Sequence, residues 1–227
     1  MIEYEPDEKR MVMKLVYFGP ALSGKTTNLL RLHDLLDPGG RGDLMVLDTK
    51  DDRTIYFDLL PFYFVTPTGM RIKLKVYTVP GHVRHNSTRK AVLTRADGVA
   101  FIADSQREEA TNNRESFGNL EENLAFVGVD IERVPLVIQF NKRDLEAIVP
   151  DQEIEQTWSA TGIPVFKASA LRGQGVIETF RGVLGPMYDY IDEEYGLQEK
   201  YEVTKGQFMR NILGADPAVA GTRNGLR

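Results

Sequence analysis

The stretch GPALSGKTT, residues 19–27, constrains the fold of this chain more than any other feature. It has the form G-x-x-x-x-G-K-T; an apolar run, MVMKLVYF, leads into it, and a helix-compatible run, TTNLLRLHDLL, overlaps its end. A strand, a glycine-bounded loop, a lysine, a hydroxyl and a helix in this order are typical of a phosphate-binding loop. In such a loop, backbone N–H groups and the helix N-terminus face an anion. We therefore expect a nucleoside phosphate to bind here.

Two side chains of this loop have expected chemical roles. Lys25 would direct a positive charge toward the outer phosphates, and the hydroxyl of Thr26 would be a ligand of Mg²⁺. The other residues expected to bind the phosphates are Gly19, Ala21, Leu22, Ser23, Gly24 and Thr27.

The remainder of the chain alternates between strand and helix patterns, which predicts a mostly parallel sheet covered by helices on both faces. Six strands are expected, at 13–18, 54–61, 71–78, 98–104, 136–141 and 165–168. Helices are expected at 25–36, 87–94, 109–127, 151–160 and 176–195. The segment VTPTG between the second and third strands is a hairpin signal, so one edge of the sheet should be antiparallel. In the last helix, Pro186 should produce a kink or a restart.

These patterns divide the chain into an N-terminal extension (1–12), a main domain (13–195) and a C-terminal extension (196–227). In the C-terminal extension, Thr204 and Gln207 form a capping-box pattern ahead of apolar residues, which predicts a short amphipathic helix ending at Gly214. Such a helix could bind a partner or a membrane surface, or could pack on its own domain. The final ADPAVAGTRNGLR has little to bury, so we expect it to be disordered.

Composition narrows the possible partners and compartments. The net charge of −5 gives no reason to expect nucleic acid or an anionic membrane as a partner. The absence of cysteine excludes disulfides and thiolate metal sites. The polar N-terminus has no signal-peptide pattern, and no apolar run is long enough to span a bilayer, so the cytoplasm is the expected compartment.

A second motif, FNKRD at 140–144, indicates which base accompanies the phosphates. It lies at the carboxyl end of a predicted strand, where open α/β sheets bind ligands. The carboxylate of Asp144 could accept the two N–H donors of guanine, with Asn141 and Lys142 shaping the pocket. One strand later, the backbone of Ser169 and Ala170 could address the base.

The chain resembles the Ras-like small GTPases and, within them, the MglA family of bacterial and archaeal polarity GTPases. The stretches that carry the resemblance are YFGPALSGKTTNL, DDRTIYFDLLP, YTVPGH, ADSQ and IQFNKRDL, between about residues 14 and 190. Membership implies a small-GTPase fold, a GTP/GDP switch with Mg²⁺, and a Roadblock-fold (MglB-like) protein that accelerates hydrolysis. It also implies a cytoplasmic protein that is recruited to a cell pole and is monomeric alone.

The resemblance extends to individual positions in the two switch segments. Thr54 matches the threonine that meets Mg²⁺ and the γ-phosphate, and Gly81 matches the glycine whose N–H senses the γ-phosphate. Arg53 resembles the family's intrinsic arginine finger, which neutralises charge on the transferred phosphoryl group. Without the resemblance to the family, the polar segment TKDDRT favours a solvated arginine at position 53 over a catalytic one.

Three positions depart from the general small-GTPase pattern. Thr78-Val79-Pro80-Gly81 stands where D-x-x-G is usual, as in the MglA family, so the usual water-mediated carboxylate for Mg²⁺ is missing. His82 replaces the glutamine that positions the attacking water; it can take that role or be a surface residue. Ala21 replaces a glycine, and its methyl group is expected to slow hydrolysis.

The predicted function is a GTP-binding switch that hydrolyses GTP slowly alone and faster with a partner, controlling cell polarity or motility. Arg53, His82 and Thr54 are the expected catalytic residues. A GTP-loaded binding module with negligible hydrolysis is the alternative favoured by Ala21 and His82. A P-loop kinase is a third possibility, although such a kinase has no need for the guanine-reading NKRD motif.

Overall fold

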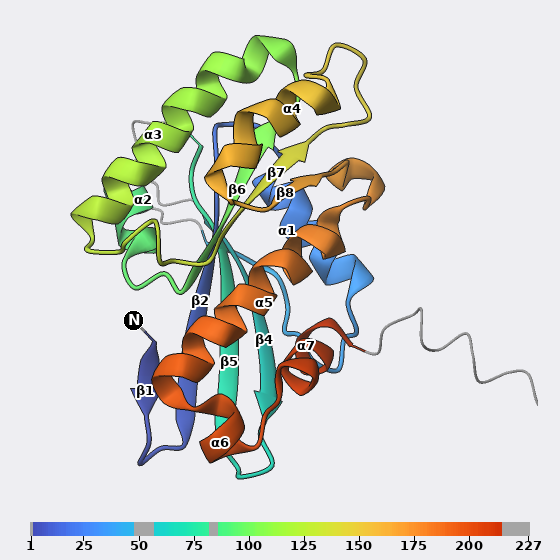
Figure 1. The fold of residues 1–227 in the computed structure, drawn as a ribbon. Coiled ribbons are helices and arrows are strands. Elements are labelled where there is room, and N and C mark those ends of the chain that lie inside the picture. Colours follow the sequence, from blue (N-terminus) through green and yellow to red (C-terminus); the bar gives the residue numbers. More distant parts are fainter. Residues whose placement is uncertain (1, 48–56, 82–85, 215–227) are drawn as a thin grey trace, which may run out of the picture.

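The computed structural model describes residues 2–47, 57–81 and 86–214. Its centre is a single sheet with helices on both faces (Figure 1). The strands are β1 (Glu3–Glu5), β2 (Arg10–Phe18), β3 (Met45–Leu47), β4 (Phe57–Val65), β5 (Arg71–Thr78), β6 (Gly98–Asp104), β7 (Leu136–Asn141) and β8 (Val165–Lys167). The helices are α1 (Lys25–Leu35), α2 (Asn86–Leu93), α3 (Ala110–Phe126), α4 (Asp151–Trp158), α5 (Val176–Tyr195), α6 (Leu197–Tyr201) and α7 (Lys205–Leu213).

The sheet has the strand order β3-β4-β5-β2-β6-β7-β8, and β1 pairs with β2. The pairs from β5 through β8 are parallel, whereas β3 with β4, β4 with β5, and β1 with β2 are antiparallel. The predicted hairpin is therefore confirmed. The expected number of six strands was too low, because β1 and β3 are only three residues long and carry no readable alternation. Of the second predicted strand, 54–61, residues 54–56 lie outside the described residues; β4 covers the remainder and extends to Val65, since its later residues pair with β5.

Two apolar cores fill the space between the sheet and its helices. Residues of β6 and β7 are buried along their whole length, as expected for central parallel strands covered on both faces. One core joins the sheet to α1, α5, α6 and α7, and the other joins it to α2, α3 and α4. The carboxyl ends of β2, β6 and β7 thus reach one edge of the sheet, from which the functional loops leave.

The longest helix, α5, does not restart at Pro186, and the kink predicted as the alternative stays a prediction. The helix continues through Pro186 without a restart, because Val183, Leu184 and Met187 on both sides are fully buried and their packing outweighs one missing backbone hydrogen bond. In Figure 1, α5 runs along the sheet as one uninterrupted helix.

The predicted C-terminal helix is confirmed as α7. The Thr204 hydroxyl accepts from the backbone N–H of Gln207, whose side chain caps the Thr204 N–H in return, and Gly214 ends the helix. Phe208 is fully buried against the rings of Phe64 and Tyr188. The helix therefore packs on its own domain, which decides between the readings left open by its sequence. None of the helices in the described ranges is both long and apolar enough to cross a bilayer.

Candidate nucleotide-binding site

The phosphate-binding loop connects β2 to α1 and is shaped by unusual backbone angles. Leu22 and Gly24 have φ values of 61° and 93°, in the left-handed region. Left-handed residues within a tight turn direct the N–H groups of the loop toward one concave side, which creates an anion-binding nest. The side chain of Leu22 points outward and is 88% exposed. The first helical hydrogen bond of α1, from the Asn28 N–H to the Gly24 carbonyl, places the helix N-terminus at the same concavity.

Gly24 must be glycine for a second reason, its contact with Asn141. A Cβ atom on Gly24 would lie 2.2 Å from Asn141 Nδ2. That amide nitrogen donates to the Ser23 carbonyl at 2.8 Å, and Asn141 Oδ1 accepts from the Ala170 N–H at 2.8 Å. Asn141 is buried, so it joins the phosphate loop to the loop after β8. These hydrogen bonds hold the two loops of the site together.

Lys25 lies inside the loop and is 7% exposed. Its Nζ donates to the carbonyls of Gly19 at 3.0 Å and Pro20 at 2.5 Å. Burial, followed by the nearby charge of Arg89, lowers the pKa of Lys25 to about 7. A phosphate group beside this ammonium would favour its charged form.

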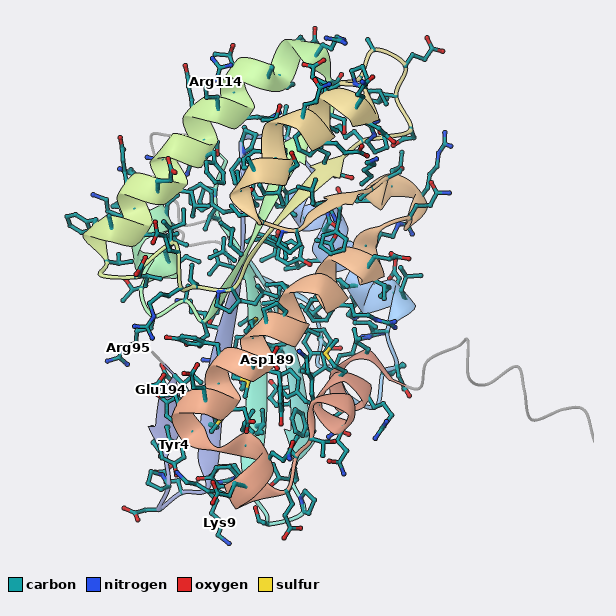
Figure 2. All side chains as sticks on the ribbon, in the orientation of Figure 1. Tyr4, Lys9, Arg95, Arg114, Asp189 and Glu194 are labelled. Atoms are coloured by element: carbon teal, nitrogen blue, oxygen red, sulfur yellow. The ribbon has the colours of Figure 1, made fainter. Side chains whose placement is uncertain are left out.

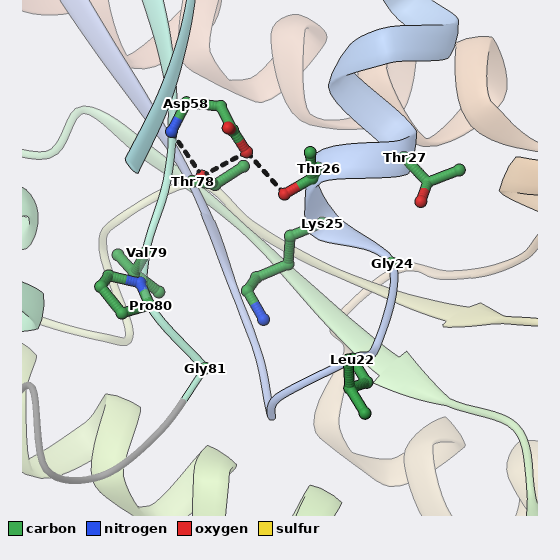
Figure 3. Close-up of a pocket in the computed structure, with 10 residues that line it drawn as sticks. All are labelled: Leu22, Gly24, Lys25, Thr26, Thr27, Asp58, Thr78, Val79, Pro80 and Gly81. Carbon is green, nitrogen blue, oxygen red and sulfur yellow. Dashed lines mark hydrogen bonds between the residues drawn. The ribbon is translucent and has the colours of Figure 1, made fainter. Parts of the chain in front are cut away.

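A cavity of about 330 Å³ opens in front of Lys25 (Figure 3). In Figure 3 the lysine side chain extends into the space between the loop and the end of β5. The lining residues are Leu22, Gly24, Lys25, Thr26, Thr27, Asp58, Thr78, Val79, Pro80 and Gly81.

Asp58 is a candidate site residue that our sequence reasoning missed. The β4–β5 hairpin pairs the next residue, Leu59, with Tyr77 and brings Asp58 into hydrogen-bond contact with Thr78, the threonine that stands at the usual aspartate position. The Thr78 hydroxyl donates to Asp58 Oδ2 at 2.9 Å and accepts from the Asp58 N–H at 2.8 Å. Thr26 Oγ1 donates to the same carboxylate oxygen at 2.6 Å. A carboxylate therefore lies beside the predicted magnesium ligand, supplied by the neighbouring strand. The available signal was an acidic residue inside the apolar run YFDLLPF.

The second predicted cluster forms an adjoining cavity of about 200 Å³. It shares Leu22, Gly24 and Thr27 with the first cavity. The other lining residues are Asn141, Lys142, Asp144, Leu145 and Leu171. Polar groups at one end and exposed leucines at the rim suit a flat heterocycle with a polar edge.

Asp144 and Lys142 are each held by a partner from another part of the chain. Ser169 Oγ donates to Asp144 Oδ1 at 2.6 Å, and this bond, helped by the charges of Arg172 and Lys142, lowers the pKa of Asp144. The carboxylate is thus charged at neutral pH, as an acceptor of two donors must be. Lys142 Nζ lies 2.5 Å from Asp104 Oδ2, a buried carboxylate at the end of β6.

Ser169 and Ala170 have contacts other than those we expected. Their backbone N–H groups already donate within the protein, to the Gln174 carbonyl and to Asn141 Oδ1 respectively. In this structure they support Asp144 and Asn141, and a direct contact of these N–H groups with a base would need those bonds to break. Their role in binding a base stays a prediction.

The predicted catalytic residues Arg53, Thr54 and His82 lie outside the described residues. Gly81 and Ala21 are described, and they are neighbours: a Cβ on Gly81 would lie 2.2 Å from the Ala21 Cα. This close approach requires glycine at position 81 and places Ala21 against the end of the cavity.

A curated relative identifies the family. The chain is 42% identical over 170 residues to "Mutual gliding-motility protein MglA" of Myxococcus xanthus (strain DK1622), covering 75% of this chain and 87% of that protein. This chain belongs to the MglA family of small GTPases. No protein-family profile matches it.

Membership in the MglA family agrees with the chemistry of the two cavities. Small GTPases generally bind GTP or GDP together with Mg²⁺. Thr26 and Asp58 offer a hydroxyl and a carboxylate, the oxygen ligands that Mg²⁺ prefers, and Lys25 offers a cation for phosphate. The residues present therefore fit both groups.

Proposed function

We propose that this protein is a GTP-binding molecular switch that hydrolyses GTP slowly alone and faster with a Roadblock-fold (MglB-like) partner. The observation that supports this proposal most strongly is that two adjoining cavities share the lining residues Leu22, Gly24 and Thr27. One cavity has a lysine, a hydroxyl and a carboxylate for phosphates and Mg²⁺, and the other has the charged Asp144 for guanine. By its family and the name of its relative, we place the switch in gliding motility and cell polarity.

In this proposal the magnesium site uses Thr26 directly and Asp58 through a water molecule. Asp58 replaces the aspartate that is usual at the position of Thr78, and Thr78 holds Asp58 in place. Thr54 completes the site only with GTP bound, since only GTP supplies the γ-phosphate that orders the first switch segment.

The proposed chemistry assigns charge stabilisation to Arg53 and water positioning to His82. An arginine finger contributes about 10³-fold or more in rate. His82 contributes less, because positioning of water leaves the electrostatic stabilisation intact. Ala21, beside Gly81, slows the reaction by occupying space near the terminal phosphate.

Two alternatives make different predictions. A GTP-loaded binding module would bind guanine nucleotides and release almost no phosphate, even with the partner. A P-loop kinase would bind ATP and GTP equally, since it has no use for Asp144. Nucleotide that copurifies with the protein, together with titrations of fluorescent GDP and ADP, separates the kinase from the other two.

The deciding experiment is single-turnover phosphate release at saturating GTP, with and without the cognate Roadblock protein. We expect slow release alone and acceleration by the partner, and we expect Arg53→Ala to lose at least about 10³-fold of the accelerated rate. Arg95→Ala, an exposed arginine after α2, is the matched control and should leave the rate unchanged. If Arg53→Ala hydrolyses GTP at the wild-type rate with the partner, the arginine is a solvated loop residue.

A further inference from the structure

Arg89 of α2 is the largest side chain that the described part of the protein buries completely. Its Nε donates to the Pro80 carbonyl at 2.9 Å, and Nη2 donates to the Gly81 carbonyl. Its Nη1 donates to Asn119 Oδ1 on α3 at 2.6 Å. Arg89 thus hydrogen-bonds to two consecutive residues that line the phosphate cavity and links them to α3.

All three acceptors of Arg89 are neutral. Two are backbone carbonyls and one is an amide, and no carboxylate within the described ranges forms an ion pair with this guanidinium. The guanidinium carbon lies 5.0 Å from the ring centre of Phe18, the residue directly before the phosphate loop. A buried charge with neutral partners is costly, and a nearby polyanion offsets that cost. The phosphate cavity is where such an anion would lie.

The hydrogen bond to Pro80 also fixes the direction of the next N–H group. The Pro80 carbonyl and the Gly81 N–H belong to one peptide plane and point in opposite directions, since the described peptide bonds are trans. Because the carbonyl faces Arg89, the Gly81 N–H faces away from it. This N–H donates to no acceptor in the described parts of the chain.

The position of Gly81 indicates which phosphate this N–H would meet. Pro80 and Gly81 line the phosphate cavity but not the adjoining base cavity, whereas Leu22, Gly24 and Thr27 line both. A nucleotide whose base occupies the second cavity would bring its terminal phosphate nearest to Pro80 and Gly81. A nucleoside diphosphate is shorter by one phosphate group, so its last phosphate would lie farther from Pro80 and Gly81.

Resting on the proposed GTP binding, we propose that Arg89 is the positioning residue that makes the site prefer a nucleoside triphosphate over a diphosphate. It directs the Gly81 N–H toward the terminal phosphate and adds an uncompensated positive charge behind it. Arg89 itself does not touch the nucleotide. Through Asn119 it also links the phosphate cavity to α3.

The test compares the affinity for the β,γ-imido analogue of GTP with that for GDP, both with Mg²⁺, in wild-type protein and in Arg89→Gln. The ratio of the two affinities should fall about tenfold in the variant, the size of one hydrogen bond to a charged group. The change in GDP affinity should be smaller. Arg114→Gln, which removes the same charge from the exposed surface of α3 (Figure 2), is the control and should keep the wild-type ratio.

A second variant, Asn119→Asp, distinguishes the effect of the Arg89 charge from the effect of its hydrogen bonds. It also provides the test if Arg89→Gln does not fold. It places a carboxylate against Nη1 without removing any of the three acceptors, so the peptide stays in place while the charge is cancelled. We expect the ratio to fall in this variant as well. An unchanged ratio in a folded Arg89→Gln, or in Asn119→Asp where the first variant does not fold, would overturn the inference. Failure of the wild type to bind GDP would instead remove the proposed function on which the inference rests.

Discussion

Replacement of Asp58 by asparagine tests the magnesium site most directly. The change keeps the shape of the side chain and one acceptor oxygen for the hydroxyls of Thr26 and Thr78, but removes the negative charge. We expect Asp58→Asn to weaken Mg²⁺ binding in the nucleotide complex. Because Asp58 is 6% exposed, little solvent would replace the lost carboxylate.

The size of the effect follows from Coulomb's law. A carboxylate and Mg²⁺ separated by one water molecule, about 4.5 Å apart, attract each other by roughly 2 kcal/mol in a water-like dielectric and roughly 7 kcal/mol at an effective dielectric of about 20. The cost of removing both charges from water opposes the larger value. We therefore adopt about 2 kcal/mol, which corresponds to about 30-fold in the Mg²⁺ dissociation constant.

The assay is a titration of Mg²⁺ into chelator-treated protein carrying fluorescent GDP, with the dissociation rate of the nucleotide as the readout. The midpoint should move about 30-fold to higher Mg²⁺ in Asp58→Asn. Asp34→Asn, an exposed acid near the other end of α1, is the matched control and should keep the wild-type midpoint. An unchanged midpoint in Asp58→Asn would show that Asp58 is only a partner of Thr78 and that the metal site lies elsewhere.

Three further predictions address the base, the loop and the sheet. Asp144→Ala should lose about 2–4 kcal/mol of guanine affinity, measured with fluorescent GDP and ADP, and a wild-type preference for ADP would contradict this reading. Gly24→Ala should lower the free energy of unfolding by about 1–2 kcal/mol or more in denaturant titrations, because φ is 93° and the methyl group would clash with Asn141. An unchanged free energy of unfolding would refute that steric argument. Burial lowers the pKa of Lys14 from 10.5 to about 8, so between these pH values the unfolded chain binds more protons than the folded chain. The stability contributed by Lys14 should therefore rise from pH 8 to pH 10.5, and it should be lost as the pH falls through 8. Thermal melts of wild type and Lys14→Met across this range should differ in slope, and parallel curves would exclude the effect.

Several features were predictable because they depend on residues close together in the sequence. The strands at 71–78, 98–104 and 136–141 and the helix at 176–195 have the predicted bounds. Their apolar periodicity is strong, and glycine or proline lies near their ends. The capping box of α7 was equally local, since Thr204 and Gln207 are three residues apart.

The sequence by itself determined the phosphate loop and the motif around Asp144, because a fixed local spacing and the shared edge of parallel strands bring them together. Only the tertiary structure decided that Asp58 lies against Thr26, since this depends on the register of the β4–β5 hairpin, which brings Asp58 into hydrogen-bond contact with Thr78. The burial of Arg89 against Pro80 and Gly81 likewise depends on how α2 packs against α3. No periodicity distinguishes an arginine that enters the core from one that faces water, because the difference lies in the neighbours that the fold provides.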